Sequence, residues 1–210
     1  MAHYGLTLIT APTSEPVSLA EAKKQCGVAN DIDYHNEHLD TLVTAAREKV
    51  ETDTGRALLT QTWDYSFDLF PCGLEPIYIP KSPVISITSL KYFDTTNTEQ
   101  TLATTVYHPS RFLNREPAEI RLKKSQSWPA LYGENGVITV RFICGYVTAL
   151  AVPESLKQAI KLLVANWFEN RSPNIIGTIN SVELSYEALI AKWQTGDEFH
   201  TYGRSFEYAL

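Results

Sequence analysis

The chain has 210 residues, three cysteines, a net charge of -6 and a pI near 5.4. This length is enough for one large domain or two small ones with a core of their own. The acidic balance argues against a protein that wraps nucleic acid through many phosphate contacts. The cysteines Cys26, Cys72 and Cys144 are odd in number and lack CxxC spacing, so they predict neither a disulfide framework nor a zinc site.

The first sixteen residues predict an extended segment with no signal peptide. They contain no basic region followed by a long apolar run, so we expect synthesis in the cytoplasm. The most apolar segment lies much later, at residues 152–171, and Lys157 and Lys161 interrupt it. Its unbroken part, residues 162–168, is too short to span the ~30 Å of a bilayer. The sequence therefore predicts no transmembrane helix.

Two helices are predicted after the extended segment. Ser18 and Glu21 have the spacing of a capping box at the start of the first, and Gly27 stands where a left-handed residue ends a helix. The second is predicted over residues 34–54, with apolar side chains at helical spacing and Gly55 at its end. Acidic residues near its start favour the positive end of the helix dipole.

From Leu58 the period changes to that of β-strands. Trp63, Tyr65, Phe67 and Leu69 alternate with polar residues, which predicts a half-buried strand. Further short strands separated by turn-rich pieces indicate an antiparallel sandwich or small barrel. They are predicted at residues 77–80, 84–93, 105–113, 118–123 and 136–146.

The chain returns to helix at Pro153, and the apolar face of this helix is unusually wide. One stripe, formed by Leu156, Ile160, Leu163, Val164 and Trp167, is expected to pack on the helix that contains residues 39–50. Ala159, Leu162 and Phe168 widen this face. Of these, Leu162 and Phe168 are predicted to meet the β-rich insert or a neighbouring subunit. A short helix is predicted at residues 184–193.

These elements predict an α+β protein. We expect a small bundle of three to four helices with an inserted antiparallel β-sandwich or barrel-like domain. Residues 1–57 form the N-terminal helical part, residues 58–150 the β-rich insert, and residues 151–195 the helices that complete the bundle. Residues 196–210 form an aromatic tail.

The search for reaction chemistry favours structural interpretations. His35 and His38 lie one turn apart among carboxylates, but a solvated acidic helix start explains them better than a metal site does. Asp64 and Asp68 have the residue type of a glycosidase pair, yet their alternation predicts an outward polar face. Trp63 and its neighbours fit a sheet core better than a carbohydrate platform. We predict no catalytic residue, cofactor or metal.

Three separated pieces of the chain are PVSLAEAKKQCGV, LDTLVTAAREKVETDTGRALLTQTWDYSFD and VPESLKQAIKLLVANWFENR. Together they resemble the bacteriophage head-tail connector proteins, also called adaptor or head-completion proteins. The most specific part is the string Glu-x-x-Thr-Gly-Arg-x-Leu-x-x-Gln-x-Trp at residues 51–63. The β-rich stretch is longer than in minimal members of this family.

The resemblance implies a non-enzymatic structural protein of the virion. Such proteins form a homo-oligomeric ring beneath the portal protein, extend the channel for DNA and offer a platform to a tail-side completion or tail terminator protein. DNA is expected to pass without sequence-specific binding. The resemblance thus places the chain at the head-tail junction of the virion after synthesis in the cytoplasm of a host bacterium. No membrane is involved.

Two other interpretations remain open at this point. One is a β-sandwich module that binds carbohydrate through Trp63 or Trp128, and the other is a hydrolase that uses Asp or His side chains of the insert. For a connector, the wide helix face predicts Leu162 and Phe168 at a subunit interface. The tail is too aromatic to be inert and too broken by glycine for a helix, so we predict that it binds the portal; the alternative is that it packs back on its own subunit. Its aromatic residues are Phe199, Tyr202, Phe206 and Tyr208.

Overall fold

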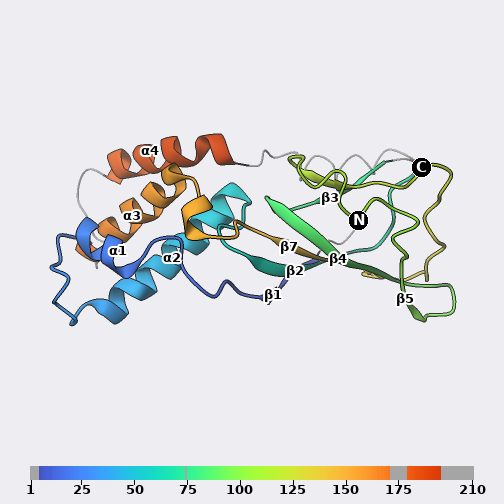
Figure 1. Cartoon of the computed structure of the whole chain (residues 1–210), viewed down its shortest axis with the longest axis horizontal. Coiled ribbons are helices and arrows are strands. Elements are labelled where there is room, and N and C mark those ends of the chain that lie inside the picture. The colour runs from blue at the N-terminus through green and yellow to red at the C-terminus, as the bar shows by residue number, and fades with distance from the viewer. Residues whose placement is uncertain (1–4, 74, 171–178, 195–210) are drawn as a thin grey trace. The chain divides into compact units, whose positions relative to one another are not determined.

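The computed structural model describes residues 5–73, 75–170 and 179–194 (Figure 1). These residues belong to two compact units. The helical unit contains residues 12–59 and the described part of 146–194, and the β unit contains residues 5–11 and the described part of 60–145. The first strand, expected to belong with the helical part, is therefore part of the β unit.

The helical unit contains α1 (Leu19–Gln25), α2 (Asn36–Thr54), α3 (Glu154–Glu169) and α4 (Ile179–Ile190). Two short 3₁₀ turns, η1 (Ala149–Ala151) and η2 (Ala191–Trp193), adjoin α3 and α4. The predicted capping box of α1 is present, because the Ser18 hydroxyl accepts from the Glu21 N–H and the Glu21 carboxylate accepts from the Ser18 N–H.

Glycines end both N-terminal helices as predicted. Gly27 has φ +67°, and the Val28 N–H donates to the Lys23 carbonyl at 2.9 Å, which completes a Schellman motif after α1. Gly55 has φ +68° at the end of α2. At the start of α3, Pro153 is the N-cap residue rather than the first helical residue. These turns direct the chain so that the helices pack on one another.

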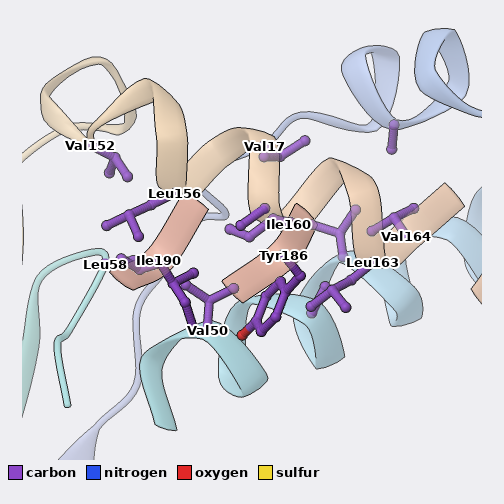
Figure 2. Close-up of a cluster of buried hydrophobic side chains, with 14 of the residues drawn as sticks. Val17, Val50, Leu58, Val152, Leu156, Ile160, Leu163, Val164, Tyr186 and Ile190 are labelled. Carbon is purple, nitrogen blue, oxygen red and sulfur yellow. The ribbon is translucent and has the colours of Figure 1, made fainter. Parts of the chain in front are cut away.

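One apolar core holds the helical unit together (Figure 2). Ile160 and Val164 of α3 are fully buried with Leu39 and Val50 of α2, as the sequence predicts. Tyr186 extends from α4 toward this cluster in Figure 2. The core also includes the following residues of the helices and of the segments next to them: Val17, Ala22, Val43, Ala46, Leu58, Leu59, Val152, Leu156, Ala159, Leu163 and Ile190.

The β unit contains a five-stranded antiparallel sheet in the order β1-β2-β7-β4-β5. Its strands are β1 (Gly5–Thr10), β2 (Gln61–Phe67), β4 (Val84–Phe93), β5 (Glu99–Thr101) and β7 (Ile138–Cys144). A separate antiparallel pair joins β3 (Ile77–Ile79) and β6 (Ala118–Ile120). The α+β class is confirmed. The expected sandwich or barrel is not confirmed, because within the described residues β1 and β5 lie at opposite edges of an open sheet.

One face of this sheet is apolar. Val140 and Phe142 of β7 are fully buried, and Tyr65 and Trp63 of β2 lie opposite them in register. Leu90 of β4 lies opposite Val140 from the other side and is also fully buried. The aromatic stripe of β2 therefore faces the sheet core, as predicted.

Two segments of the β unit differ from the sequence-based expectations. The segment at residues 105–113 is not a strand and contributes only an isolated bridge between Tyr107 and Leu122. Pro109 lies in the middle of this segment and has no N–H for a ladder. The polar piece at residues 99–101, expected as a turn, pairs with β4 as β5.

The end of β2 also differs. Asp68 was expected on the solvated face but is only 5% exposed, because β2 ends at Phe67 and Asp68 accepts a hydrogen bond of 2.7 Å from the Gly136 N–H. Leu69, expected on the apolar face, is exposed for the same reason. Asp64 keeps its outward position and accepts two bonds of 2.7 Å from the Arg141 guanidinium.

Candidate functional site

The turn that follows α2 is organised by the buried Glu51 carboxylate. One of its oxygens accepts from the Leu58 N–H at 2.7 Å, and the other accepts from Nη1 of Arg47 at 2.8 Å. Thr54 donates its hydroxyl to the Val50 carbonyl at 2.6 Å, and Gly55 reverses the chain. The first residues of the distinctive string at 51–63 therefore end α2 and form the turn that follows it.

Arg47 extends this network to the segment before α1. Its Nε donates to Glu15 at 2.8 Å, and its side chain is 7% exposed. Burial lowers the pKa of Arg47, but the carboxylates of Glu51 and Glu15 outweigh burial and hold the pKa above its ordinary value. Arg47 is therefore charged, and its charge is balanced on both sides.

Arg56, the arginine of the string, connects the same turn to the C-terminal end of the helical unit. Its Nε donates to the Trp193 carbonyl at 2.7 Å, and its guanidinium lies 5.3 Å from the centroid of the Trp193 ring. The Trp193 indole N–H in turn donates to the Ser155 hydroxyl at 2.7 Å. Arg56 joins segments 137 residues apart, so its role in this turn is structural.

A second polar link holds α4 on α2. The Tyr186 hydroxyl donates to Asp53 at 2.6 Å, and Lys49 forms an ion pair with the same carboxylate at 2.7 Å. Burial and the neighbouring Asp53 raise the pKa of Tyr186 above its ordinary value. With α4 held in this way, the helical unit forms a single body that can present side chains to a partner.

The predicted interface residues Leu162 and Phe168 are half-buried and pack against the helical core of their own chain. The Phe168 ring meets the His35 ring edge-on with 5.2 Å between centroids, and it lies 6.1 Å from the His38 ring. Phe168 therefore contacts the start of α2, which the sequence-based expectation did not include. Part of each side chain remains accessible to a partner.

The most exposed apolar side chains of the helical unit lie elsewhere and were missed by the sequence reasoning. Leu150 in η1 is 90% exposed, and Val147 just before η1 is also exposed. Tyr34, before α2, is 89% exposed, and Ile32 lies near it in the sequence. Single exposed apolar side chains are common on protein surfaces, and it is contiguous groups of them that mark contacts with another protein. Their signal in the sequence was weak because they lie in connecting segments without a period.

The four aromatic residues predicted to bind the portal lie outside the described residues, so their surroundings are not part of the site described above. They are Phe199, Tyr202, Phe206 and Tyr208.

The residues considered for other chemistry have structural surroundings. His35 and His38 contact Phe168, and within the described ranges no three His, Cys, Asp or Glu side chains gather as metal ligands would. The Trp63 ring has the Lys81 amine 4.7 Å from its centroid, and Trp128 stacks on Phe70 with 4.7 Å between centroids. Of the helices described, none has the length and apolar content needed to cross a membrane.

Comparison with known proteins identifies relatives of this chain. Residues 16–121 match the family model of the phage gp6-like head-tail connector protein, and this range includes α1, α2 and the turn organised by Glu51. No curated protein sequence matches the chain.

Solved structures with a similar fold come from gene transfer agent (GTA) particles. A chain of the native GTA virion has a TM-score of 0.71 and 23% identity, covering 91% of this chain and 95% of its own. A chain from the neck of the native particle, computed with C12 symmetry, has a TM-score of 0.69 and 22% identity. One from the neck of the empty particle, computed with C6 symmetry, has a TM-score of 0.72 and 21% identity. Each of these two matches covers 91% of this chain and 96% of the neck chain. The fold is therefore shared over nearly the full length of both chains.

Proposed function

Because this chain belongs to the phage gp6-like head-tail connector family, we propose that it is a structural protein of the virion that forms a ring beneath the portal. The ring extends the channel for DNA and gives a tail-side completion or tail terminator protein a platform for attachment. Its work is to hold neighbours together, with no catalytic step. The family match, which includes the turn organised by Glu51, is the observation that carries this proposal.

The fold comparison supports assembly into a ring. Structures of similar fold belong to GTA necks that were computed with C12 and C6 symmetry. A cyclic ring needs a heterologous interface, in which each subunit presents one surface to the next subunit and a different one to the previous. We assign Leu162, Phe168 and Tyr34 to one such surface, because the Tyr34 and Phe168 rings both contact the His35 ring, and the exposed Leu150 and Val147, before α3, to another.

The remaining partners follow from the same position in the particle. The aromatic tail, with Phe199, Tyr202, Phe206 and Tyr208, binds the portal protein, since aromatic side chains contribute much of the binding energy at protein interfaces. The opposite side of the ring meets the tail-side protein. Synthesis takes place in the cytoplasm of the host bacterium, and the protein ends at the head-tail junction of the virion.

The proposal is tested by mixing the purified chain with the portal protein of the same phage and measuring mass by light scattering. We expect a complex that contains several copies of this chain on each portal. A variant that ends at Gly196 lacks the aromatic tail and should lose this complex while its far-ultraviolet circular dichroism is unchanged. If the full chain stays monomeric in the presence of the portal, the proposed function is wrong.

The subunit interface has its own test. Leu162→Asp places a charge on the proposed interface, so ring assembly on the portal should fall strongly because an unpaired charge is costly to bury. Gln158→Asp, at an exposed position of the same helix, is the matched control and should assemble normally. Equal assembly by the two variants would remove Leu162 from the interface.

A further inference from the structure

Three arginine side chains surround one phenyl ring in the β unit. The guanidinium carbons of Arg115, Arg111 and Arg121 lie 5.0, 5.5 and 5.7 Å from the centroid of the Phe112 ring. The His108 ring meets the same ring edge-on at 5.7 Å. Guanidinium groups stack favourably on aromatic faces and still point N–H donors outward. We call Phe112 and these three arginines the Phe112 arginine cluster.

Backbone hydrogen bonds hold the cluster in place. The His108 N–H donates to the Arg121 carbonyl, and the Lys123 N–H donates to the Val106 carbonyl, each at 2.9 Å. Between these bonds, the Glu119 N–H donates to the Phe112 carbonyl at 3.3 Å. The two ends of the loop are thus joined at its base. The arginines therefore start from a preorganised backbone, which reduces the entropy lost when they bind a ligand.

The cluster carries more positive than negative charge. The buried Glu119 carboxylate accepts from Arg115 at 3.1 Å through both oxygens, and it also accepts from Nε of Arg121. Burial raises the pKa of Glu119, but these hydrogen bonds outweigh burial and hold the pKa below its ordinary value. This ionised carboxylate pairs with two of the three guanidinium groups, those of Arg115 and Arg121.

The surrounding sequence adds to this excess. Residues 111–124 contain five basic side chains and two acidic ones, whereas the whole chain contains 18 basic and 24 acidic residues. Arg111 and Lys124 are exposed, and the Lys123 amine is fixed by donation to the Thr104 carbonyl at 2.8 Å. The segment is therefore a local basic surface on an acidic protein.

We propose that the Phe112 arginine cluster, with Lys123 and Lys124, binds the phosphate backbone of double-stranded DNA. Guanidinium forks match phosphate oxygens in charge and geometry, and lysine adds positive charge nearby. The basic side chains are carried by a loop rather than by a helix or ribbon that enters a groove, so the contacts are with phosphates and independent of base sequence. The choice of DNA rests on the proposed function, which places the chain beside the DNA channel.

The test is a titration of a fluorescent 20-base-pair duplex with the full chain, followed by anisotropy at several salt concentrations. With about three phosphates neutralised, the logarithmic salt slope is about -2.7, so affinity should fall about 40-fold between 50 and 200 mM salt. Arg111→Glu combined with Lys124→Glu should weaken binding at 50 mM salt by at least about tenfold. Loss of two phosphate contacts should also reduce the slope by about 2.

Two further variants separate this site from general charge effects. Lys24→Glu reverses an exposed charge on α1 of the helical unit and should match the wild type in DNA affinity. Arg111→Glu alone changes the net charge by the same amount but should weaken DNA binding. Phe112→Leu removes the stacking ring while keeping an apolar side chain, and should weaken DNA binding with unchanged circular dichroism.

Besides normal DNA binding by the double variant, three results would overturn the DNA site. They are no duplex binding by the wild type at 50 mM salt, an equal loss in Lys24→Glu and Arg111→Glu, or displacement of the duplex by a poly-glutamate peptide at lower concentration than by unlabelled duplex. The last result would indicate an acidic protein partner. The two proposals can fail separately. If the wild type assembles on the portal and the double variant still binds DNA normally, the ring proposal stands and the DNA site is rejected. If the double variant loses DNA binding but the wild type does not assemble on the portal, the DNA site stands and the ring proposal is rejected.

Discussion

The helical unit and the β unit bury their apolar and charged side chains in different ways. The helical unit encloses one apolar core and places a buried ion network, Glu51 with Arg47 and Glu15, at its margin. The β unit has an apolar sheet face, but its edge strand β1 is exposed along all six residues and contains no charged side chain. Edge strands are usually protected by charged side chains, by bulges or by a covering segment, and β1 has a register shift between Leu8 and Thr10. The helical unit therefore pairs its buried charges within its own fold, whereas the β unit leaves one uncharged sheet edge exposed.

The largest expected effect concerns the ion network of the helical unit. Glu51→Ala leaves the buried Arg47 guanidinium and the Leu58 N–H without this acceptor, so the free energy of unfolding of the helical unit should fall by about 3–5 kcal/mol. Urea denaturation followed by circular dichroism at 222 nm measures this change. Glu48→Ala removes an exposed carboxylate that pairs with the same Arg47 at 3.5 Å, and because an exposed ion pair contributes little, it should stay within about 0.5 kcal/mol of the wild type. A small effect of Glu51→Ala would show that the network adds little to this unit.

The next effect compares the core and the edge of the β unit. Leu90→Ala in β4 removes a fully buried side chain and should cost about 2–5 kcal/mol. Leu8→Ala in β1, where the side chain is 43% exposed, should cost much less, about 0.5 kcal/mol. Fluorescence of Trp63 and Trp128, in variants that lack Trp167 and Trp193, reports on this unit during urea denaturation. Similar costs at the two positions would contradict the contrast between edge and core.

The smallest effect tests the link between α4 and α2. Tyr186→Phe removes the hydrogen bond to Asp53 and should cost about 1 kcal/mol at neutral pH. The pKa of Tyr186 is raised in the folded state above its ordinary value of 10.0. The proton of Tyr186 therefore adds to the free energy of unfolding in full below pH 10.0, and this contribution is lost as the pH rises above that value.

The pH dependence supplies the control for this link. The melting temperature of the wild type should fall more steeply than that of Tyr186→Phe between about pH 9 and pH 11. Parallel curves for the two proteins would show that the Tyr186 proton is not linked to folding.

Sequence reasoning described the helical unit well because its signals are local and periodic. Ser18, Gly27 and Gly55 determine helix ends through their own backbone and side-chain chemistry, so neighbours in sequence suffice. The apolar period of α3 identified Ile160 and Val164 as core residues. The ion network was not predicted, because it joins Glu15 to Arg47 across 32 residues and no periodic pattern reports such a contact.

The β unit was described less well because strand pairing is set by distant residues. The segment around Tyr107 has alternating character, but its backbone bonds with residues 121–123 end after a single bridge. Residues 99–101 look like a turn by composition and still pair as an edge strand, since polar side chains are tolerated at an exposed edge. Asp68 was assigned to solvent because the end of β2 was expected two residues too late.

The candidate surfaces were only partly accessible to sequence reasoning. The width of the α3 face led to the prediction that Leu162 and Phe168 lie at an interface, but the contact of Phe168 with His35 depends on the packing of α3 near the start of α2. The Phe112 arginine cluster had a signal in the density of basic residues after Arg111. That signal was hidden by the acidic balance of the whole chain and by the expectation of a strand in the same segment.

The discontinuity of the helical unit has a consequence for the order of events on the ribosome. Residues 12–59 supply α1 and α2, but their core partner α3 is made only after residue 153. All described strands of the β unit are complete by Cys144, so this unit is free to fold while α1 and α2 still lack their partner. Newly made chains thus pass through a stage in which the apolar faces of α1 and α2 are open to chaperones, and synthesis of α3 and α4 closes that stage.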